Sequence, residues 1–471
     1  MESDTRNWSQ QTFGSAALGD ERRVRRLIQM AARAAEKPHG RVTRVFPSGR
    51  EREGAYDFIE NSAVEVEELT RALSNSTAQE AASHPFVFVP IDGSSLKLWD
   101  GTGKKDFGRV GSHTNGATGL KVINGVMVSP QGVPLGLAAQ RWWSRPKRRQ
   151  ERAHHHCRSV EDKETSHWLN AVEQVIVAQR EHAPQSKLWF QLDREADSRL
   201  IFEKFLEHGD WFTIRSSTNR YLVNRSRRLH DFIRKAPVRL RTELFVPARK
   251  AFKRKTERKE RLAQLSVRAE SVDVAFREQS NRQLHPRTLN IVHVREAGTT
   301  PKGEKPLQWF LLTNHPIETE DDIRKVIFGY TQRWRVEDFH KTWKSGLCNV
   351  EENQLHSSAA VMRWATILAA VAARAEKLKH LSRTEPKSPA SGEFSNEELE
   401  ALRLLRTEFG PLSEKQPRKL DLRTATLWIA ELGGYTGKSS GGPPGTITIQ
   451  RGLDQVLAAA RLLMIQNKLN K

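Results

Sequence analysis

Two short apolar segments, each followed at once by an aspartate, constrain the fold of this chain most. They are residues 86–91, which precede Asp92, and residues 188–192, which precede Asp193. An apolar run of five or six residues is typical of a strand that is buried on both faces. Carboxylates that follow such strands face the crevice where open α/β sheets bind ligands. The sequence therefore predicts an α/β domain with two aspartates at the carboxyl edge of its sheet.

Other segments extend this pattern. Ser129-Pro130-Gln131-Gly132 separates two strand-like segments and is typical of a hairpin turn. A later group of strand-like segments predicts an all-β insertion at about residues 225–318. In the last strand of this insertion, Trp309 and Phe310 point to opposite faces, so we expect one of them to leave the core of the insertion. The segments with strand composition are 120–128, 133–138, 211–215, 265–269, 272–276, 289–293 and 309–313, and helices are predicted at 161–180 and 321–344.

The charge of the chain indicates a polyanionic partner. Its 77 Lys and Arg residues exceed its 56 Asp and Glu residues, which gives a net charge of +21 and a pI of about 10.1. Basic residues recur along the whole chain, as DNA or RNA binding requires, and the alternative is a generically basic protein. Two cysteines do not make a disulfide framework and suit a reducing cytoplasm. The longest apolar run, 364–373, is shorter than the about 20 residues of a membrane span, so we expect no membrane insertion.

The predicted helix at 321–344 carries a candidate reactive face. At about 100° per residue, Tyr330, Arg333, Glu337, Lys341 and Lys344 fall within an arc of about 80°. A carboxylate beside cations and a phenol suits phosphoryl transfer, which needs a metal ligand and donors to phosphate oxygens. The alternative is a solvated face of ion pairs. The opposite, packed face is predicted to hold Phe328, Val336, Phe339 and Trp343.

Three carboxylates form a candidate metal site. Asp92 and Asp193 at strand ends, together with Glu337 on the helix, can hold two divalent cations. Oxygen ligands favour Mg²⁺, with Mn²⁺ as a substitute. By contrast, His154-His155-His156-Cys157 are adjacent residues that alternate in direction, so an exposed loop is the better interpretation than a zinc site.

The motifs also carry a family resemblance. The segment from Tyr330 to Lys344 resembles the YREK motif of the IS-four group of insertion-sequence transposases, and Asp193-Arg-Glu-Ala-Asp197 is similar to the Tn-five transposase branch. Phe13-Gly-Ser-Ala-Ala-Leu-Gly-Asp20, Glu53-Gly-Ala-Tyr56 and Pro306-Leu-Gln-Trp309 point the same way. The resemblance implies a DDE transposase with an RNase H-like catalytic core, an inserted all-β subdomain, and helical N-terminal and C-terminal domains.

The resemblance also implies roles for individual residues. Asp92, Asp193 and Glu337 match the catalytic triad, which holds two Mg²⁺ ions per active site. Two departures are Gly93-Ser94-Ser95, where relatives commonly have two threonines, and Asp338, which replaces a second glutamate. The implied DNA contacts are Tyr330, Arg333, Lys341, Lys344 and Arg215, with Trp309 stacking on a base flipped from the DNA end.

Three domains are expected. Residues 1–72 form a helical DNA-end-binding domain, in which Asp20 caps a helix and Arg22, Arg26 and Arg33 form a basic stripe. For any single arginine of this stripe, a solvated helix face is the alternative. Residues 73–370 form the catalytic domain, and residues 371–471 form a helical dimerisation region.

The resulting hypothesis is a bacterial, cytoplasmic and nucleoid-associated transposase that acts on double-stranded DNA. It nicks the terminal inverted repeats of a transposon, forms hairpins and transfers strands to target DNA within a homodimeric synaptic complex. Two alternatives stay open. One is a catalytically silent DNA-binding repressor or scaffold, and the other is a plain metal-dependent nuclease.

Overall fold

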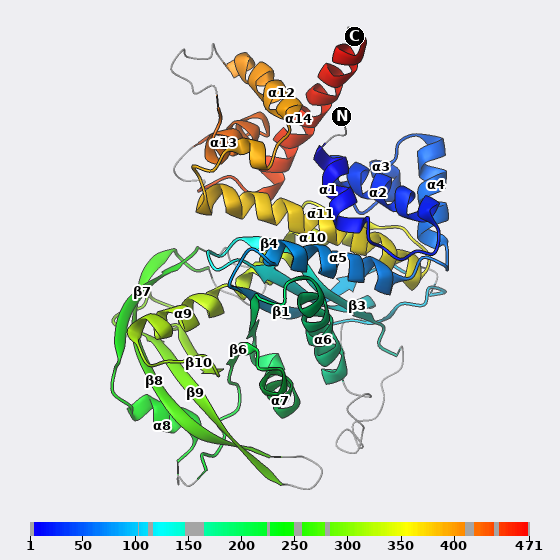
Figure 1. Ribbon diagram of the computed structural model, residues 1–471. Helices are drawn as coiled ribbons and strands as arrows, with labels where there is room; N and C mark the ends of the chain where they lie inside the picture. Colours follow the sequence, from blue (N-terminus) through cyan, green and yellow to red (C-terminus); the bar gives the residue numbers. More distant parts are fainter. Residues whose placement is uncertain are drawn as a thin grey trace.

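The computed structural model describes residues 4–101, 103–111, 116–146, 164–223, 227–248, 257–277, 283–409, 419–437 and 442–469. The segment His154-His155-His156-Cys157 lies outside the described residues. In Figure 1 the N-terminal helices and the C-terminal helices lie on the same side of a large sheet, and the long helix α11 (Ser358–Thr384) runs between them and the sheet.

The N-terminal region is helical, as the sequence predicts. Asp20 caps the second helix by accepting a hydrogen bond from the Arg22 backbone N–H at 2.8 Å, and Ser48 caps the fourth helix. The helices are α1 (Asp4–Phe13), α2 (Glu21–Glu36), α3 (Val42–Val45), α4 (Gly49–Glu60) and α5 (Val66–Ala81).

All ten strands of the described residues belong to one mixed sheet. Its order is β2-β3-β1-β5-β6-β10-β9-β8-β7, and β4 pairs with β3. The β1–β5 and β5–β6 pairs are parallel, and the other pairs are antiparallel. The strands are β1 (Phe86–Lys97), β2 (Gly108–Arg109), β3 (Thr118–Val128), β4 (Pro134–Trp143), β5 (Lys187–Leu192), β6 (Trp211–Arg215), β7 (Leu240–Val246), β8 (Arg261–Arg277), β9 (Leu284–Glu296) and β10 (Gln308–Thr313).

The prediction that Asp92 ends a strand is only partly right. The parallel pairing of β1 with β5 does end at Ile91 opposite Leu192, one residue before each aspartate. However, β1 itself continues to Lys97 because it stays paired with β3 on its other side. Asp92 therefore lies inside a strand, at the point where the parallel ladder stops. Asp193 follows the end of β5, as predicted.

The predicted all-β insertion differs from the structure in two ways. It contains a helix, α8 (Leu229–Lys235), and its strands do not form a separate sheet, because β10 pairs directly with β6. Both sides of this sheet are covered, so Trp309 and Phe310 are buried, with 5% and 9% of their surfaces exposed. The expectation that one of them leaves the core is therefore wrong.

Two layers of helices cover the sheet. One hydrophobic core joins its strands to the N-terminal helices and to α9 (Glu320–Thr331), α10 (Trp334–Lys344) and the first half of α11 (Ser358–Thr384). The second core, on the other face, includes α6 (Thr165–His182), α7 (Arg199–His208) and α8. The helices α12 (Asn396–Arg406), α13 (Leu422–Leu432) and α14 (Thr446–Leu469) form a third core with the end of α11.

The predicted single helix at 321–344 is in fact two helices. Helix α9 ends at Thr331, and α10 begins at Trp334 after a turn in which the Arg335 N–H bonds to the Gln332 carbonyl at 2.9 Å. The packed face was also predicted incorrectly at one position, since Phe328 is 42% exposed. Val336, Phe339 and Trp343 are buried as predicted.

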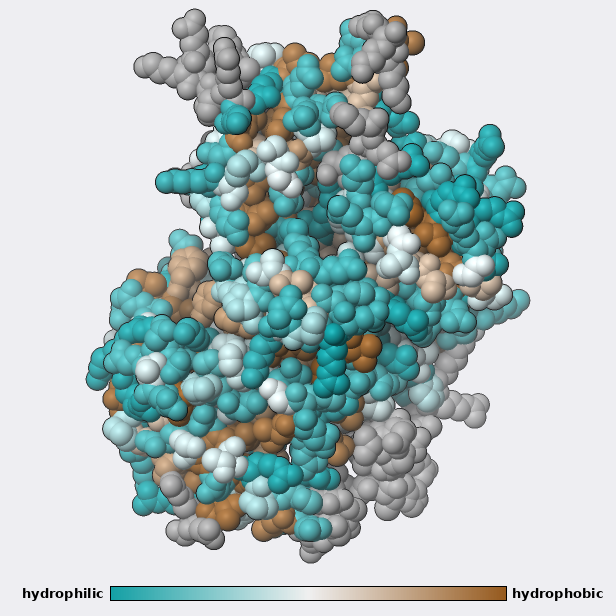
Figure 2. Space-filling view, in the orientation of Figure 1, coloured by the Kyte–Doolittle hydropathy of each residue, from teal (hydrophilic) through white to brown (hydrophobic). Residues whose placement is uncertain are grey.

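Within the described part of the chain, one helix is long and apolar enough to cross a membrane by length and composition alone. This helix is α11, and 78% of its most apolar window is buried inside the protein. Packing against the sheet and the helical regions accounts for that composition. Figure 2 shows a mostly hydrophilic surface on the visible face, with hydrophobic residues showing among the helices at the top and again in the lower half of the view.

Candidate active site

The three predicted carboxylates converge around one arginine. Arg333 lies in the turn between α9 and α10, and its guanidinium is 2.7 Å from the Glu337 carboxylate and 4.0 Å from that of Asp193. Asp92 is close enough to all three of these residues for each to affect its pKa. The fold thus brings together Asp92 and Asp193, which are 101 positions apart in the sequence (193 − 92), and Asp193 and Glu337, which are 144 positions apart (337 − 193).

The pKa of Asp92 in this cluster is unusually high for a carboxyl group. Burial raises the pKa of Asp92 to about 7, and the negative charges of Glu337 and Asp193 add to this effect. Arg333 and the Gly93 backbone N–H, which donates to Asp92 at 2.8 Å, act in the opposite direction. A strongly perturbed acid among further carboxylates is a feature of functional sites.

Arg333 is buried among these groups, with only 9% of its side chain exposed. Burial opposes its charged form, but neighbouring Tyr330, Glu337 and Asp193 outweigh that effect and raise its pKa. Its Nε atom is buried and makes no hydrogen bond within the described residues. A donor directed into a cluster of this kind is available to an incoming oxygen ligand.

Tyr330 presents a second unsatisfied polar group. Only 3% of the residue is exposed, and its hydroxyl makes no hydrogen bond of normal geometry within the described residues. Burial raises its pKa to about 12, while Arg333 and Arg215 are near enough to oppose that rise. The phenol therefore stays protonated near pH 7, beside two guanidinium groups that could also contact a phosphate.

Two further residues that the resemblance implies as DNA contacts, Arg215 and Trp309, lie next to this cluster. Arg215 ends β6 and donates to the Gln308 carbonyl at 3.4 Å. The neighbouring Trp309 packs edge-on against Tyr330, with ring centroids 5.1 Å apart, and against Trp334 at 6.2 Å. Trp309 is thus placed beside the cluster, but its indole is covered by these rings.

The two lysines of α10 are placed differently. Lys344 donates to the Ser94 hydroxyl at 3.3 Å and lies 3.7 Å from the Glu351 carboxylate. Lys341 is exposed to solvent. Glu351, which the sequence does not single out, also accepts a hydrogen bond from the Lys97 backbone N–H at 2.8 Å. Nothing in the sequence pattern connects Glu351 with the end of β1, because the short helix that carries it is brought there only by the fold.

The donor set of the cluster fits a hard divalent cation. Asp92, Asp193 and Glu337 offer carboxylate oxygens, which Mg²⁺ and Mn²⁺ prefer. The negative charges of Glu337 and Asp193 add to the burial that raises the pKa of Asp92, and a cation would offset their repulsion. The residues therefore fit the metal ions that the resemblance implies.

A second acidic cluster consists of Asp338, Glu376 and His380, whose ligand atoms lie within 4.8 Å of one another. Protein groups already surround the Glu376 carboxylate, since Lys379 pairs with it and Thr342 and Thr446 donate to it. Only 1% of Glu376 is exposed. This cluster is best described as an ion-paired joint that links α10, α11 and the start of α14.

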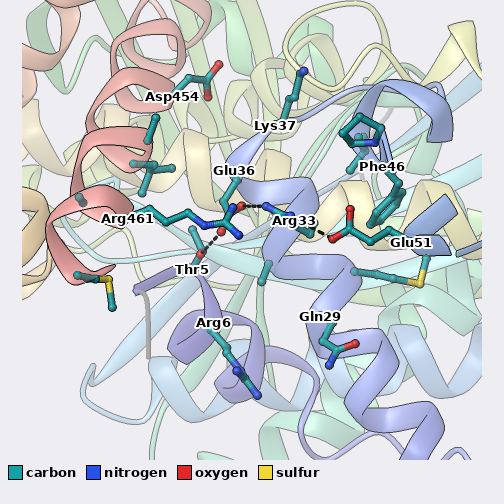
Figure 3. Close-up of a pocket in the computed structure, with 18 of the residues that line it drawn as sticks. Thr5, Arg6, Gln29, Arg33, Glu36, Lys37, Phe46, Glu51, Asp454 and Arg461 are labelled. Carbon is teal, nitrogen blue, oxygen red and sulfur yellow. Dashed lines mark hydrogen bonds and ion pairs between the residues drawn. The ribbon is translucent and has the colours of Figure 1, made fainter. Parts of the chain in front are cut away.

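The predicted basic stripe of the N-terminal region is divided in the structure. Arg22 is 85% exposed and pairs with its own cap, Asp20, at 3.0 Å. Arg26 is half-buried and lines a cavity of about 880 Å³ between the N-terminal helices and α14. Figure 3 shows Arg33 in the same cavity, held between Glu36 at 2.9 Å and Glu51 at 3.0 Å. The positive charge of Arg33 is therefore used in ion pairs within the protein.

The N-terminal helices also match a known family. Residues 5–64, which include α1 to α4 together with Arg22 and Arg26, match the family described as transposase DNA-binding. This match supports a transposase and supports DNA as its partner. The large mixed α/β sheet and its many helices are consistent with an α/β transposase.

Proposed function

We propose that this chain is a DDE transposase of the cut-and-paste type, with an RNase H-like catalytic core and the YREK residues of the IS-four group. The observation that carries the proposal is the convergence of Asp92, Asp193 and Glu337 on Arg333 in a chain whose residues 5–64 match a transposase DNA-binding family. Its substrates would be the terminal inverted repeats of a transposon and a target duplex, in the cytoplasm of a bacterium.

Each part of the cluster has a role in this proposal. Asp92, Asp193 and Glu337 would hold two Mg²⁺ ions, or Mn²⁺ in their place, which when bound supply an activated water and neutralise charge on the phosphate. Arg333, Tyr330 and Lys344 would hold the phosphate oxygens, with Arg215 and Lys341 nearby. The unsatisfied Tyr330 hydroxyl and Arg333 Nε are donors that the protein itself leaves available.

Arg333 has a further part in this reaction. Its ion pair with Glu337 neutralises the carboxylate and gives one nitrogen of the buried guanidinium a partner. A phosphate that binds Arg333 would replace Glu337 as its partner and leave that carboxylate available as a ligand. Substrate binding would thereby help to assemble the catalytic site.

The later steps of the proposal involve Trp309 and the C-terminal helices. Hairpin formation would flip a base onto Trp309, which needs the indole to separate from Tyr330 and Trp334, because only 5% of it is exposed here. A homodimeric synaptic complex would use the C-terminal region, where Leu462, Ile465 and Leu469 of α14 are exposed.

The experiment that tests this proposal is a cleavage assay on a labelled duplex made from the inverted repeats that flank the coding sequence. We expect Asp193→Ala and Glu337→Ala to abolish nicking in Mg²⁺ while the affinity for the duplex is kept, since the metals serve chemistry and the basic surface serves binding. Asp231→Ala, an exposed acid on α8, is the matched control and should cleave normally.

Each alternative has its own outcome in this assay. A wild-type protein that binds the duplex but never cuts it would be the silent repressor or scaffold. A protein that cuts the duplex but joins no end to a target plasmid would be the plain nuclease. Normal cleavage by Asp193→Ala would remove the triad assignment.

A further inference from the structure

A chain of buried side-chain hydrogen bonds crosses the core between β4 and α10. Trp142 Nε1 lies 3.1 Å from Gln140 Oε1, Gln140 Nε2 lies 2.9 Å from Asn124 Oδ1, and Asn124 Nδ2 lies 2.9 Å from His340 Nε2. Thr366 of α11 also donates to Gln140 Oε1, at 2.6 Å. All five side chains are buried, and Asn124 is fully inaccessible.

The direction of every bond in this chain follows from its first member. An indole N–H can only donate, so the group of Gln140 that faces Trp142 must be its carbonyl oxygen. The Gln140 amide nitrogen then donates to the Asn124 oxygen, and the Asn124 amide nitrogen in turn donates to His340. His340 Nε2 must therefore accept, which requires a neutral ring protonated on Nδ1. Burial, which lowers the pKa of His340 to about 3, agrees with a neutral ring.

The two ends of the Asn124–His340 bond lie beside two members of the candidate triad. Asn124 is the direct cross-strand partner of Asp92 in the antiparallel β1–β3 pair, so both side chains lie on the same face of the sheet. His340 follows Glu337 by three residues on α10, which makes them neighbours on the helix surface. One hydrogen bond thus ties β3, the strand that pairs with the strand of Asp92, to the helix of Glu337.

We infer that Asn124 and His340 are positioning residues, which fix the rotation and height of α10 on the sheet so that Glu337 faces Asp92 and Asp193. Apolar packing of Val336, Phe339 and Trp343 holds the helix on the sheet but tolerates small displacements. A hydrogen bond between a buried donor and a buried acceptor does not tolerate such displacements, because a shift of α10 would leave both groups without a partner. This inference rests on the proposed function, since it concerns the ligands of the proposed metal site.

The test compares variants that keep or remove the acceptor on α10. His340→Gln can place an oxygen near the position of Nε2, whereas His340→Met has a similar volume and offers no comparable acceptor. Asn124→Leu breaks the same bond from the other side. The matched control is His315→Met, a histidine that is also buried and stacks on Trp189 beyond the opposite end of the parallel strands.

The main readout is Mn²⁺ binding to the full-length, DNA-free protein, measured by isothermal titration calorimetry. We expect about 10- to 100-fold weaker binding for His340→Met and Asn124→Leu, as for other residues that orient metal ligands. His340→Gln and His315→Met should stay within about threefold of the wild type. Nicking by His340→Met should require correspondingly more Mg²⁺ for half-maximal rate, with the affinity for the end duplex unchanged.

The outcomes separate this inference from the proposed function. If Asp193→Ala loses Mn²⁺ binding but a folded His340→Met binds Mn²⁺ as the wild type does, the positioning role is wrong and the proposed function stands. If Asp193→Ala itself binds Mn²⁺ normally, the proposed metal site fails. Should His340→Met not fold, Asn124→Leu replaces it. Failure of both to fold would make the bond a requirement for folding and would also overturn the positioning role.

Discussion

Among the residues of the candidate site, Asp92 is the one whose pKa the fold changes most. This change has a measurable effect on stability. Its pKa rises from 3.8 to about 7 on folding, chiefly through burial. The folded protein therefore binds a proton that the unfolded chain releases between these values. The ionised carboxylate costs stability above pH 7, and this cost disappears as the pH falls towards 4.

Asp92→Asn should consequently stabilise the metal-free protein at high pH. In EDTA at pH 8 we expect its free energy of unfolding to exceed that of the wild type by on the order of 2 kcal/mol, a figure that allows for partial exposure. The difference should shrink as the pH is lowered to 4. Urea denaturation across this pH range measures it, and a variant less stable than the wild type at pH 8 would contradict the assignment.

At the scale of elements, the closest approach of α9 to the sheet depends on a glycine. A Cβ atom at Gly329 would lie 2.6 Å from Cε1 of Phe88 and 3.1 Å from Nε2 of Gln191. Phe88 cannot easily yield, because it is 1% exposed and packs against Trp189 at 5.2 Å between ring centroids. Gly329 therefore sets how deeply Tyr330, the next residue, enters the site.

Gly329→Ala should displace α9 and impair both stability and cleavage. Overpacking of a buried site costs about 1–3 kcal/mol, and the better helix propensity of alanine returns at most about 1 kcal/mol. We expect a net loss of about 1–2 kcal/mol in thermal or urea unfolding and a lower nicking rate. Lys325→Ala, an exposed position of the same helix, should change neither. A Gly329→Ala protein as stable as the wild type would show that the contact can relax.

The elements also show what the sequence can and cannot predict. Apolar runs and a Pro-Gly turn are local signals, so β5 and the hairpin between β3 and β4 agree with their predictions. The extension of β1 past Asp92 depends on its partner β3, and the break before α10 depends on contacts such as that of Arg335 with the Gly132 carbonyl. The clustering of Arg333 with Asp193 and Glu337 could be predicted, because the strand-end aspartate and the motif from Tyr330 to Lys344 are visible in the sequence. The Asn124–His340 bond could not, because it joins two residues that are 216 positions apart and belong to no motif.

At the scale of the whole molecule, the N-terminal helices are not an independent module. Residues from Phe13 to Leu73 share one hydrophobic core with β1, α10 and α11. Deleting residues 1–72 would expose the apolar surface of the remaining chain, so loss of DNA binding by such a truncation would not identify the recognition surface. A point substitution at the junction is the more informative change.

Arg363 of α11 offers that substitution. Its side chain is buried and donates to two carbonyls of the N-terminal region, those of Val64 at 2.5 Å and Ile59 at 2.9 Å. The neighbouring Trp364 donates to the Gly40 carbonyl at 2.7 Å. Burial lowers the pKa of Arg363 and Glu67 opposes this, so the buried charge is kept at a cost that these carbonyls and Glu67 offset.

Arg363→Met should loosen the N-terminal helices while leaving the sheet intact. Two buried carbonyls would lose their donors, at a cost of about 1–3 kcal/mol each, and this cost falls on the junction. In hydrogen exchange we expect the amides of α4 to exchange at least about 25-fold faster, since two lost donors cost at least about 2 kcal/mol and 1.4 kcal/mol corresponds to tenfold, while those of β5 keep their protection. Arg71→Met, an exposed position of α5, is the control. Equal loss of protection in α4 and β5 would contradict this prediction, because it would mean that the molecule unfolds as one unit.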